Sequence, residues 1–292
     1  MKYLISVLIL AALSTGQEKP ASRRPHCEAV PPAKCAAHQK ALGEEKDRIL
    51  AAMKLKQHDK AGFDLYETPM VDYWIPEGDK KSYMLPFNLA EQALSIYGDG
   101  AQTVRRGDVV LDCGANVGVF TRLALDHGAS KVIAIEPAPE NLECLRRNFA
   151  TEIAGGRVQV IPKGVWDKED TLTLNVDPTN SAADSFVIKR QGSVGLTKVP
   201  LTTIDRLVDQ LALEHVDFIK MDIEGAEPNA LQGAQHTISK WKPRISVSAY
   251  HQPDHPVVIP RIIFGARPDY TMICGPCEAV GGKARPDILW FR

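Results

Sequence analysis

The sequence predicts an α/β fold with a mostly parallel sheet of seven strands, because short apolar, β-branched runs alternate with amphipathic segments along most of the chain. A glycine-rich turn follows the first of these runs, which is typical of a strand that leads into a ligand-binding helix. The last two runs have no helical pattern between them, which indicates an antiparallel C-terminal strand. The predicted strands cover residues 109–112, 131–136, 158–163, 217–221, 244–250, 269–273 and 287–291.

The first 34 residues predict a targeting segment and a linker. Residues 1–16 combine a basic start, a short apolar run and small residues, which is typical of a signal peptide, with a short membrane anchor as the alternative. Residues 17–34 are rich in proline and charge and predict a linker. The expected location is therefore exported or periplasmic. A membrane-anchored or cytoplasmic protein is the alternative, and a membrane is a partner only if the first segment is uncleaved.

Residues 35–106 predict a helical and aromatic cap before the main domain. Residues 35–57 have the apolar spacing of an amphipathic helix, and a second helix is predicted from Asn88 to Tyr97. The aromatic residues between them predict packing against the sheet. A substrate contact at Trp74 is an alternative, because a cap over a cleft is also where a substrate is held.

The turn after the first strand predicts a nucleotide-like cofactor site. Asp112 ends the strand, and Gly114, Asn116 and Gly118 let the backbone approach a ligand at the N-terminus of the next helix. A dinucleotide fingerprint needs a glycine where Asn116 stands, so pyrophosphate binding is disfavoured. Glu136 ends the second strand, where a carboxylate can accept both hydroxyls of a ribose.

Two later motifs add a family resemblance. With the glycine turn, the segment from Val216 to Glu227 and the strand from Arg244 to His251 resemble the FkbM family of class I S-adenosylmethionine-dependent methyltransferases. The resemblance covers about residues 74–292. It implies a Rossmann-like methyltransferase domain over residues 107–292, an S-adenosylmethionine cofactor, and O-methylation of a small-molecule or glycan hydroxyl.

Between the third and fourth strands, residues 171–176, 185–190 and 197–201 alternate in polarity and predict short antiparallel strands. Trp166 stands just before this insertion. It is a candidate for stacking on the adenine of the cofactor, and packing inside the protein is the alternative.

The catalytic candidates lie at the end of the fourth parallel strand and of its neighbour. Alternation along the strand places Lys220 and Asp222 on one face, and Glu224 follows beyond the carboxyl end. A lysine in an apolar strand needs a carboxylate partner. His251 ends the adjacent strand, so it or Asp222 can accept the proton of the acceptor hydroxyl. Alternatively, Asp222, Glu224 and His251 hold a divalent metal such as Mg²⁺.

Composition and cysteine spacing limit the other functions. The 292 residues carry a formal net charge of −1 and no basic block with interleaved aromatics, so a nucleic-acid partner is not expected.

Cys27 with Cys35, and Cys274 with Cys277, predict two local disulfides in an oxidising compartment. Cys-Gly-Pro-Cys also matches a thioredoxin site, so a thiol oxidoreductase is one alternative function. A noncatalytic methyltransferase-like binding module is the other.

Overall fold

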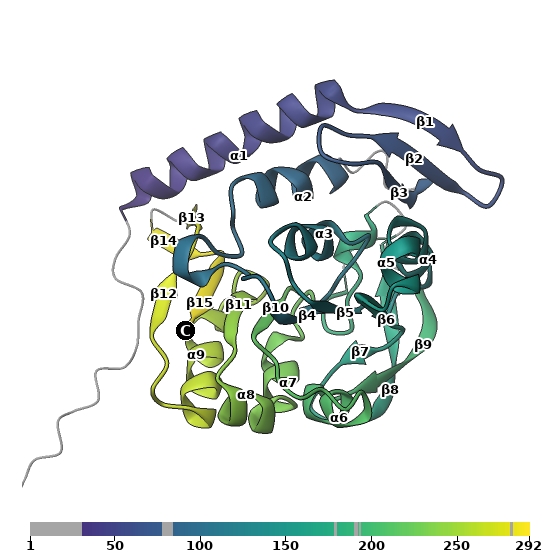
Figure 1. Ribbon diagram of the computed structural model, residues 1–292. Coiled ribbons are helices and arrows are strands. Elements are labelled where there is room, and N and C mark those ends of the chain that lie inside the picture. Colours follow the sequence, from purple (N-terminus) through teal and green to yellow (C-terminus); the bar gives the residue numbers. More distant parts are fainter. Residues whose placement is uncertain (1–30, 78–83, 178–179, 190–191, 193, 281–282) are drawn as a thin grey trace, which may run out of the picture.

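The central sheet has seven strands, six of which run in the same direction, and β15 runs antiparallel between β11 and β12 (Figure 1). The predicted fold class is therefore confirmed. The computed structural model describes residues 31–77, 84–177, 180–189, 192, 194–280 and 283–292. In sheet order, the strands are β12 (Met272–Cys274), β15 (Ile288–Phe291), β11 (Arg244–Ser248), β10 (Phe218–Met221), β4 (Val109–Cys113), β5 (Lys131–Ile135) and β6 (Val158–Ile161).

Helices cover both faces of this sheet (Figure 1). Val110 packs with Phe120 on one face, whereas its neighbour Leu111 belongs to the cluster of Leu231 on the other. Because both faces are buried, the strands are continuous apolar runs that the sequence alone makes visible. The helices are α3 (Val119–Asp126), α4 (Pro139–Asn148) and α5 (Ala150–Ala154) on one face, and α6 (Ile204–Gln210), α7 (Glu227–Gln232), α8 (Gln235–Trp241) and α9 (His255–Ala266) on the other.

The N-terminal region forms a cap above α3 (Figure 1). Leu42 and Ile49 of its long helix and Leu89 of its second helix form one buried cluster with Val117 and Val119, which attaches the cap to the main domain. The predicted domain boundary at residue 106 stays a prediction. The cap consists of α1 (Pro32–Ala52), the antiparallel strands β1 (Lys54–His58), β2 (Phe63–Glu67) and β3 (Tyr73–Pro76), α2 (Met84–Ala93), and the short helix η2 (Gly100–Gln102).

Both ends of both helices predicted in this region are wrong. α1 begins at Pro32, inside the predicted linker, because proline is well suited to the first turn of a helix. It ends at Ala52 rather than at residue 57, since β1 pairs with β2 instead of continuing the helix. The second helix begins at Met84 and ends at Ala93, so it lies four residues earlier than predicted.

The insertion after β6 differs in part from its prediction. β8 (Asp170–Val176) pairs antiparallel with β9 (Val194–Thr202) as expected, and β7 (Gly164–Val165) joins the same sheet. Residues 185–190 form no strand among the described residues, and Ser185 makes a single bridge to Asn175. The short helix η3 (Ser181–Ala183) lies in the insertion, between β8 and β9.

The disulfide pairing is long-range, which corrects the predicted local loops. Cys35 of α1 is bonded to Cys277 at the start of β13 (Cys277–Val280), which forms a hairpin with β14 (Lys283–Pro286). Cys274 is also disulfide-bonded. The Cys-Gly-Pro-Cys segment therefore does not hold a pair of neighbouring thiols, and the thiol oxidoreductase interpretation is wrong. The pairing predicted for Cys27 lies outside the described residues.

The predicted signal peptide or anchor (1–16) also lies outside the described residues. Among the residues that the structure does describe, none of the helices combines the length and apolar character that a membrane span requires.

Asp287 gives a pH-dependent prediction at the contact between α1 and the C-terminal segment. Gln39 donates a hydrogen bond to Asp287 Oδ2 at 3.1 Å, while burial and then Glu278 raise the pKa of Asp287 to about 7. Because the folded pKa lies above the unfolded value of 3.8, the folded state binds the proton more tightly and its stability falls as the pH rises from about 4 to 7. Asp287→Asn stays neutral, so we expect it to unfold at a higher urea concentration than wild type at pH 8 and at a similar one at pH 4. Equal midpoints at both pH values would contradict this.

Candidate active site

A cavity of about 450 Å³ lies at the carboxyl ends of β4 and β10, beneath the cap. Parallel strands of open α/β sheets bind ligands at this edge. Its walls include the turn after β4, the end of β10, helix α2 and the segment before η3. The polar lining residues are Lys46, Asn88, Glu91, Gln92, Tyr97, Asn116, Asn180, Lys220, Asp222, Glu224 and Tyr250.

The turn after β4 is shaped by close approach of the backbone. Gly114 has φ +80°, and a Cβ atom there would lie 1.9 Å from the carbonyl oxygen of Asp222, so only glycine fits. Gly118 has φ +97°, and its Cβ would lie 2.1 Å from Phe149. Gly114 lines the cavity, whereas Gly118 serves the packing of α3 and lies outside the cavity lining. The structure thus gives Gly118 a packing role, and its predicted cofactor contact stays a prediction.

Glu136 at the tip of β5 is tied to this turn. Its Oε2 accepts a hydrogen bond from the backbone N–H of Asn116 at 2.8 Å, and its Oε1 accepts one from Ala138, also at 2.8 Å. Burial raises the pKa of Glu136, although these backbone donors oppose the shift. A small hollow beside the carboxylate is lined by Gly114, Asn116 and Glu136 together. The structure thus brings these three predicted cofactor residues together.

Asp112 and Lys220 form a buried ion pair behind the cavity. Lys220 Nζ lies 3.3 Å from Asp112 Oδ1 and donates to the carbonyl of Gly114 at 2.7 Å, while Thr121 donates to Asp112 Oδ2 at 2.7 Å. Burial raises the pKa of Asp112. Burial opposes the charge of Lys220, but Asp112 and Asp222 raise its pKa. Asp112 is fully buried, so it orders the turn through Lys220 rather than touching a ligand.

Asp222 receives a hydrogen bond that the sequence did not reveal. The hydroxyl of Tyr97 donates to its Oδ2 at 2.6 Å, and the ammonium of Lys220 lies 5.3 Å from the centre of the Tyr97 ring. Burial opposes ionisation, but Lys220 and His251 lower the pKa of Asp222. Burial and the adjacent Asp222 raise the pKa of Tyr97 far above its usual range. Asp222 is therefore a carboxylate at the cavity wall.

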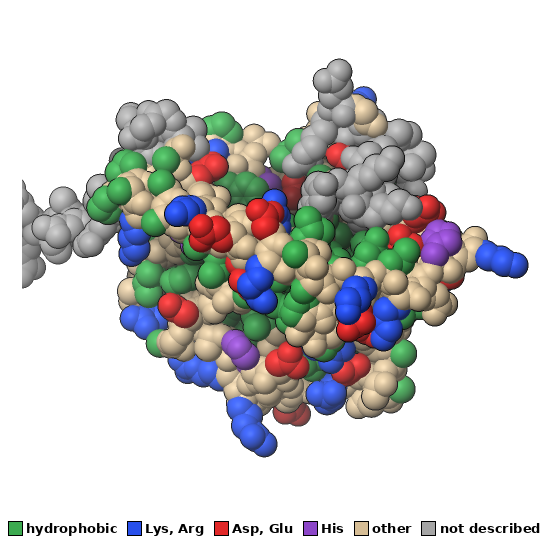
Figure 2. Space-filling model, turned by 90° about the horizontal axis from the view of Figure 1, so that it is seen from above, with side chains coloured by type: hydrophobic (Ala, Val, Ile, Leu, Met, Phe, Trp, Pro, Cys, Tyr) green, Lys and Arg blue, Asp and Glu red, His purple; other side chains and the backbone are tan. Residues whose placement is uncertain are grey.

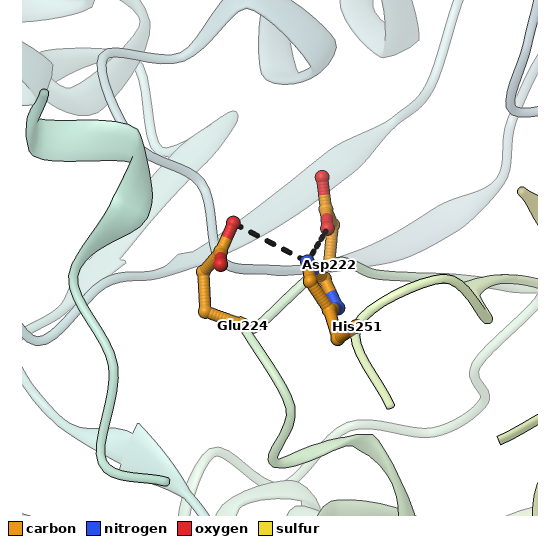
Figure 3. Close-up of side chains that lie close together, drawn as sticks. All are labelled: Asp222, Glu224 and His251. Atoms are coloured by element: carbon orange, nitrogen blue, oxygen red, sulfur yellow. Dashed lines mark ion pairs between the residues drawn. The ribbon is translucent and has the colours of Figure 1, made fainter. Parts of the chain in front are cut away.

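Asp222, Glu224 and His251 converge, as predicted from their strand ends (Figure 3). His251 Nε2 lies 3.5 Å from Asp222 Oδ1 and 3.3 Å from Glu224 Oε1, and the imidazole side chain is only 2% exposed. Burial lowers the pKa of His251, but Glu227, Glu224 and Asp222 raise it well above its ordinary value. The structure thus brings both predicted proton acceptors, Asp222 and His251, to one place at the edge of the sheet.

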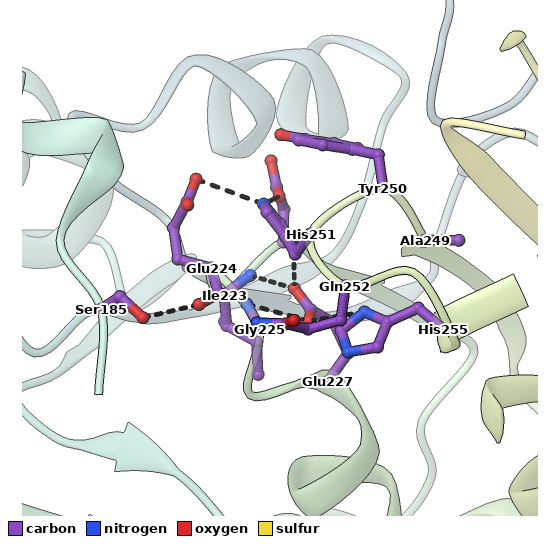
Figure 4. Close-up of polar contacts among 12 residues, drawn as sticks. Ser185, Ile223, Glu224, Gly225, Glu227, Ala249, Tyr250, His251, Gln252 and His255 are labelled. Carbon is purple, nitrogen blue, oxygen red and sulfur yellow. Dashed lines mark hydrogen bonds and ion pairs between the residues drawn. The ribbon is translucent and has the colours of Figure 1, made fainter. Parts of the chain in front are cut away.

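Glu227 holds this cluster in place from below (Figure 4). Its Oε1 lies 2.8 Å from His251 Nδ1 and accepts from the backbone N–H of Ile223 at 2.9 Å, and its Oε2 accepts from the N–H of Gly225 at 3.1 Å. Glu227 is fully buried. Because its two oxygens are fixed by the backbone, its carboxylate fixes the orientation of the imidazole.

Glu224 projects from a constrained backbone position. Its φ is +54°, in the left-handed region that non-glycine residues seldom adopt. The hydroxyl of Ser185, from the insertion, donates to the carbonyl of Glu224 at 2.6 Å and holds this conformation (Figure 4). The segment between β10 and α7 therefore turns the carboxylate toward His251.

Sequence reasoning missed three residues of the site. Tyr97 comes from the cap, 125 positions before Asp222, and no local signal links them. Glu91 of α2 also lines the cavity, where burial and then Asp222 raise its pKa well above the usual range. Glu227 stands in the motif after β10, and its position in the first turn of α7 is the signal that could have marked it.

Two tryptophan candidates lie away from the cavity. Trp166 is not among the residues that line the cavity, and its backbone N–H donates to the carbonyl of Thr202, so adenine stacking by Trp166 stays a prediction. Trp74 is bonded through its backbone to Asn148 and lies 4.8 Å from the guanidinium of Arg147. It packs the cap onto α4 rather than lining the cavity.

Comparisons with known proteins agree with this architecture. Methyltransferase sdnD of Sordaria araneosa is 26% identical over 173 residues, which are 46% of this chain and 66% of that protein. The 31-O-demethyl-FK506 methyltransferase FkbM of Streptomyces tacrolimicus is 29% identical over 170 residues, which are 49% of this chain and 64% of that protein. The chain thus spans slightly less than two thirds of the length of each.

A solved structure and a family model extend the comparison. The crystal structure of Methyltransferase FkbM from Methylobacillus flagellatus KT has a TM-score of 0.50 and 21% identity, and the match covers 89% of this chain and 60% of that one, which shows the shared fold. The family model described as the Methyltransferase FkbM domain matches residues 112–264, more than half of the chain and the whole stretch from Asp112 to His251. The chain belongs to the FkbM methyltransferase family.

Proposed function

We propose that the chain transfers a methyl group from S-adenosylmethionine to a hydroxyl of a small-molecule or glycan acceptor. The observation that carries this proposal is the juxtaposition of the Gly114 turn and Glu136 with a cavity that Asp222 and Glu224 also line. The family supports methyl transfer. The relative from Streptomyces tacrolimicus is named as a methyltransferase of 31-O-demethyl-FK506, which supports oxygen as the acceptor atom.

The residues at the turn fit the cofactor. A side chain at Gly114 would clash with the backbone of Asp222, so glycine keeps this tight turn in shape, and Glu136 is held beside it by Asn116 and Ala138. The Asn116 amide oxygen is buried and accepts no hydrogen bond within the described part of the chain. When bound, S-adenosylmethionine supplies a methyl group already activated by the positive charge on sulfur. Glu136 would accept hydrogen bonds from the ribose hydroxyls of the cofactor. Gly114 and Asn116 would contact the part of the cofactor next to the ribose.

The residues across the cavity would position the acceptor. As the acceptor oxygen receives the methyl group, Asp222 would accept the hydroxyl proton and pass it to water. Asn88, Gln92 and Tyr250 offer amide and hydroxyl groups in the same cavity, which suit an acceptor that carries several hydroxyls. Positioning can therefore supply much of the rate.

The surface supports a small acceptor rather than a nucleic acid. On the face seen in Figure 2, Lys and Arg side chains are interspersed with Asp and Glu, and no basic stripe crosses it. The formal net charge of −1 agrees with this. Export remains a prediction that the Cys35–Cys277 disulfide supports, because disulfides persist mainly in oxidising compartments.

Glu136→Gln tests the cofactor site. Glutamine replaces one of the two accepting oxygens by an NH₂ group that only donates, so the bond from Asn116 or Ala138 is lost and the ribose loses a charged acceptor. We expect the dissociation constants of S-adenosylmethionine and S-adenosylhomocysteine to rise at least about tenfold in calorimetry. Glu140→Gln, at an exposed acid in the first turn of α4, is the matched control and should bind like wild type. Unchanged cofactor affinity in a folded Glu136→Gln variant would show that Glu136 does not bind the cofactor.

Transfer itself is tested with methyl-labelled S-adenosylmethionine and a panel of polyhydroxylated acceptors. Label on an acceptor oxygen supports the proposal. Cofactor binding without transfer to any of them would favour a noncatalytic module instead.

A further inference from the structure

We propose that Asp222, Glu224 and His251 form a binding site for a divalent transition-metal ion of the Mn²⁺ or Zn²⁺ class, which would hold the acceptor oxygen. The first observation is the geometry of the three donors. One ligand atom from each residue lies within 4.8 Å of the others, and His251 Nε2 is 3.5 Å and 3.3 Å from the two carboxylates. Ligands about 2.1 Å from one ion lie about 3 Å apart when adjacent, so the two His251 contacts are already near the required spacing.

The second observation is the imidazole itself. The side chain of His251 is 2% exposed, and its Nε2 has no hydrogen-bond partner among the described residues, although it points between the two carboxylates (Figure 3). Asp222 Oδ1, on the same side, is likewise buried without a hydrogen bond in that part of the chain. The two atoms are in contact as an ion pair at 3.5 Å but make no hydrogen bond, and an ion placed between the three donors would satisfy both.

The third observation is the support behind the ring. His251 Nδ1 contacts Glu227, whose oxygens are fixed by the N–H groups of Ile223 and Gly225 (Figure 4). A metal-binding histidine usually donates its other ring N–H to a carboxylate, which fixes the tautomer and aims the free nitrogen at the ion. Glu227 is therefore a positioning residue for Nε2. Because it is buried and bonded on both oxygens, it is poorly placed to be a ligand.

The donor set selects the ion. Mg²⁺ prefers oxygen ligands, whereas an imidazole nitrogen with two carboxylates suits Mn²⁺, Zn²⁺ or Fe²⁺ better. This refines the Mg²⁺ expected from the sequence. Binding releases the proton from the imidazole nitrogen to water.

The position of the three donors at the cavity wall suggests a role for the ion in catalysis. Asp222 and Glu224 line the cavity and His251 lies behind them, so three protein ligands leave open coordination positions on the cavity side. An acceptor hydroxyl bound there would be oriented and made more acidic, which favours loss of its proton as the methyl group arrives. This use rests on the proposed function, whereas metal binding itself does not.

The test uses Mn²⁺ as the probe on the full, metal-free chain without cofactor. We expect paramagnetic resonance to show one bound Mn²⁺ per chain, displaced by Zn²⁺ at lower concentrations than by Mg²⁺. Glu224→Gln and His251→Gln should each weaken Mn²⁺ binding at least about tenfold, and Glu227→Gln should weaken it less. His215→Gln is the matched control, since His215 lies 3.1 Å from Asp217 on the surface and should change nothing.

Circular dichroism shows whether each variant is folded, independently of the metal and of the cofactor. Absence of stoichiometric Mn²⁺ and Zn²⁺ binding to the wild-type chain overturns the metal proposal whatever the variants do. Methyl transfer that survives complete chelation overturns its use while leaving the proposed function intact. Stoichiometric metal binding without any methyl transfer would support the metal site and contradict the proposed function.

Discussion

Asp222→Asn is expected to lower kcat for methyl transfer at least about a hundredfold while the dissociation constant of S-adenosylmethionine stays within about threefold of wild type. The carboxylate faces His251 and Tyr97 at the cavity wall, on the acceptor side of the Gly114 turn. As a proton acceptor or as a ligand, it acts through a negative charge that asparagine lacks. A loss confined to kcat is the pattern of an interaction made mainly in the transition state.

Tyr97→Phe is the control for the lost hydrogen bond. It removes the 2.6 Å contact to Asp222 Oδ2 but leaves the carboxylate, so we expect a fall smaller than that of Asp222→Asn. Initial rates with methyl-labelled cofactor and the acceptor found in the panel measure both. A kcat for Asp222→Asn within about threefold of wild type would show that the chemistry does not depend on this carboxylate.

Lys220→Met is expected to lower the free energy of unfolding by about 3 to 5 kcal/mol, because it leaves the carboxylate of Asp112 buried without its partner. Lys220 and Asp112 side chains are 6% and 0% exposed, so water cannot replace the ammonium. Methionine keeps most of the apolar stem and therefore isolates the loss of charge. Urea unfolding followed by circular dichroism measures the change.

Two further variants serve as controls for the stability loss of Lys220→Met. Lys40→Met removes one side of a surface pair with Glu44, at 77% and 68% exposure, and should cost less than about 1 kcal/mol. Adding Asp112→Asn to Lys220→Met removes the unpaired charge and should recover part of the stability. If Lys220→Met were no more destabilised than Lys40→Met, the buried pair would not stabilise the fold as argued.

The sequence determined the central sheet and half of the site. β4, β5 and β10 are buried on both faces, so their β-branched runs are visible without any knowledge of their neighbours. The position of Gly114 after Asp112 is equally local, because a strand that turns sharply into a helix requires it. Parallel strand ends meet at one edge of a sheet, so the convergence of Asp222, Glu224 and His251 also followed from the order of strands.

Only the tertiary structure decided the contacts between segments distant in the chain. The hydrogen bond from Tyr97 to Asp222 spans 125 positions, and the Cys35–Cys277 disulfide spans 242. Asp112 faces Lys220 instead of the cavity because β4 and β10 lie side by side in the sheet. Periodicity and turn chemistry act over a few residues, whereas these pairings depend on how the cap, the helices and the sheet pack against one another.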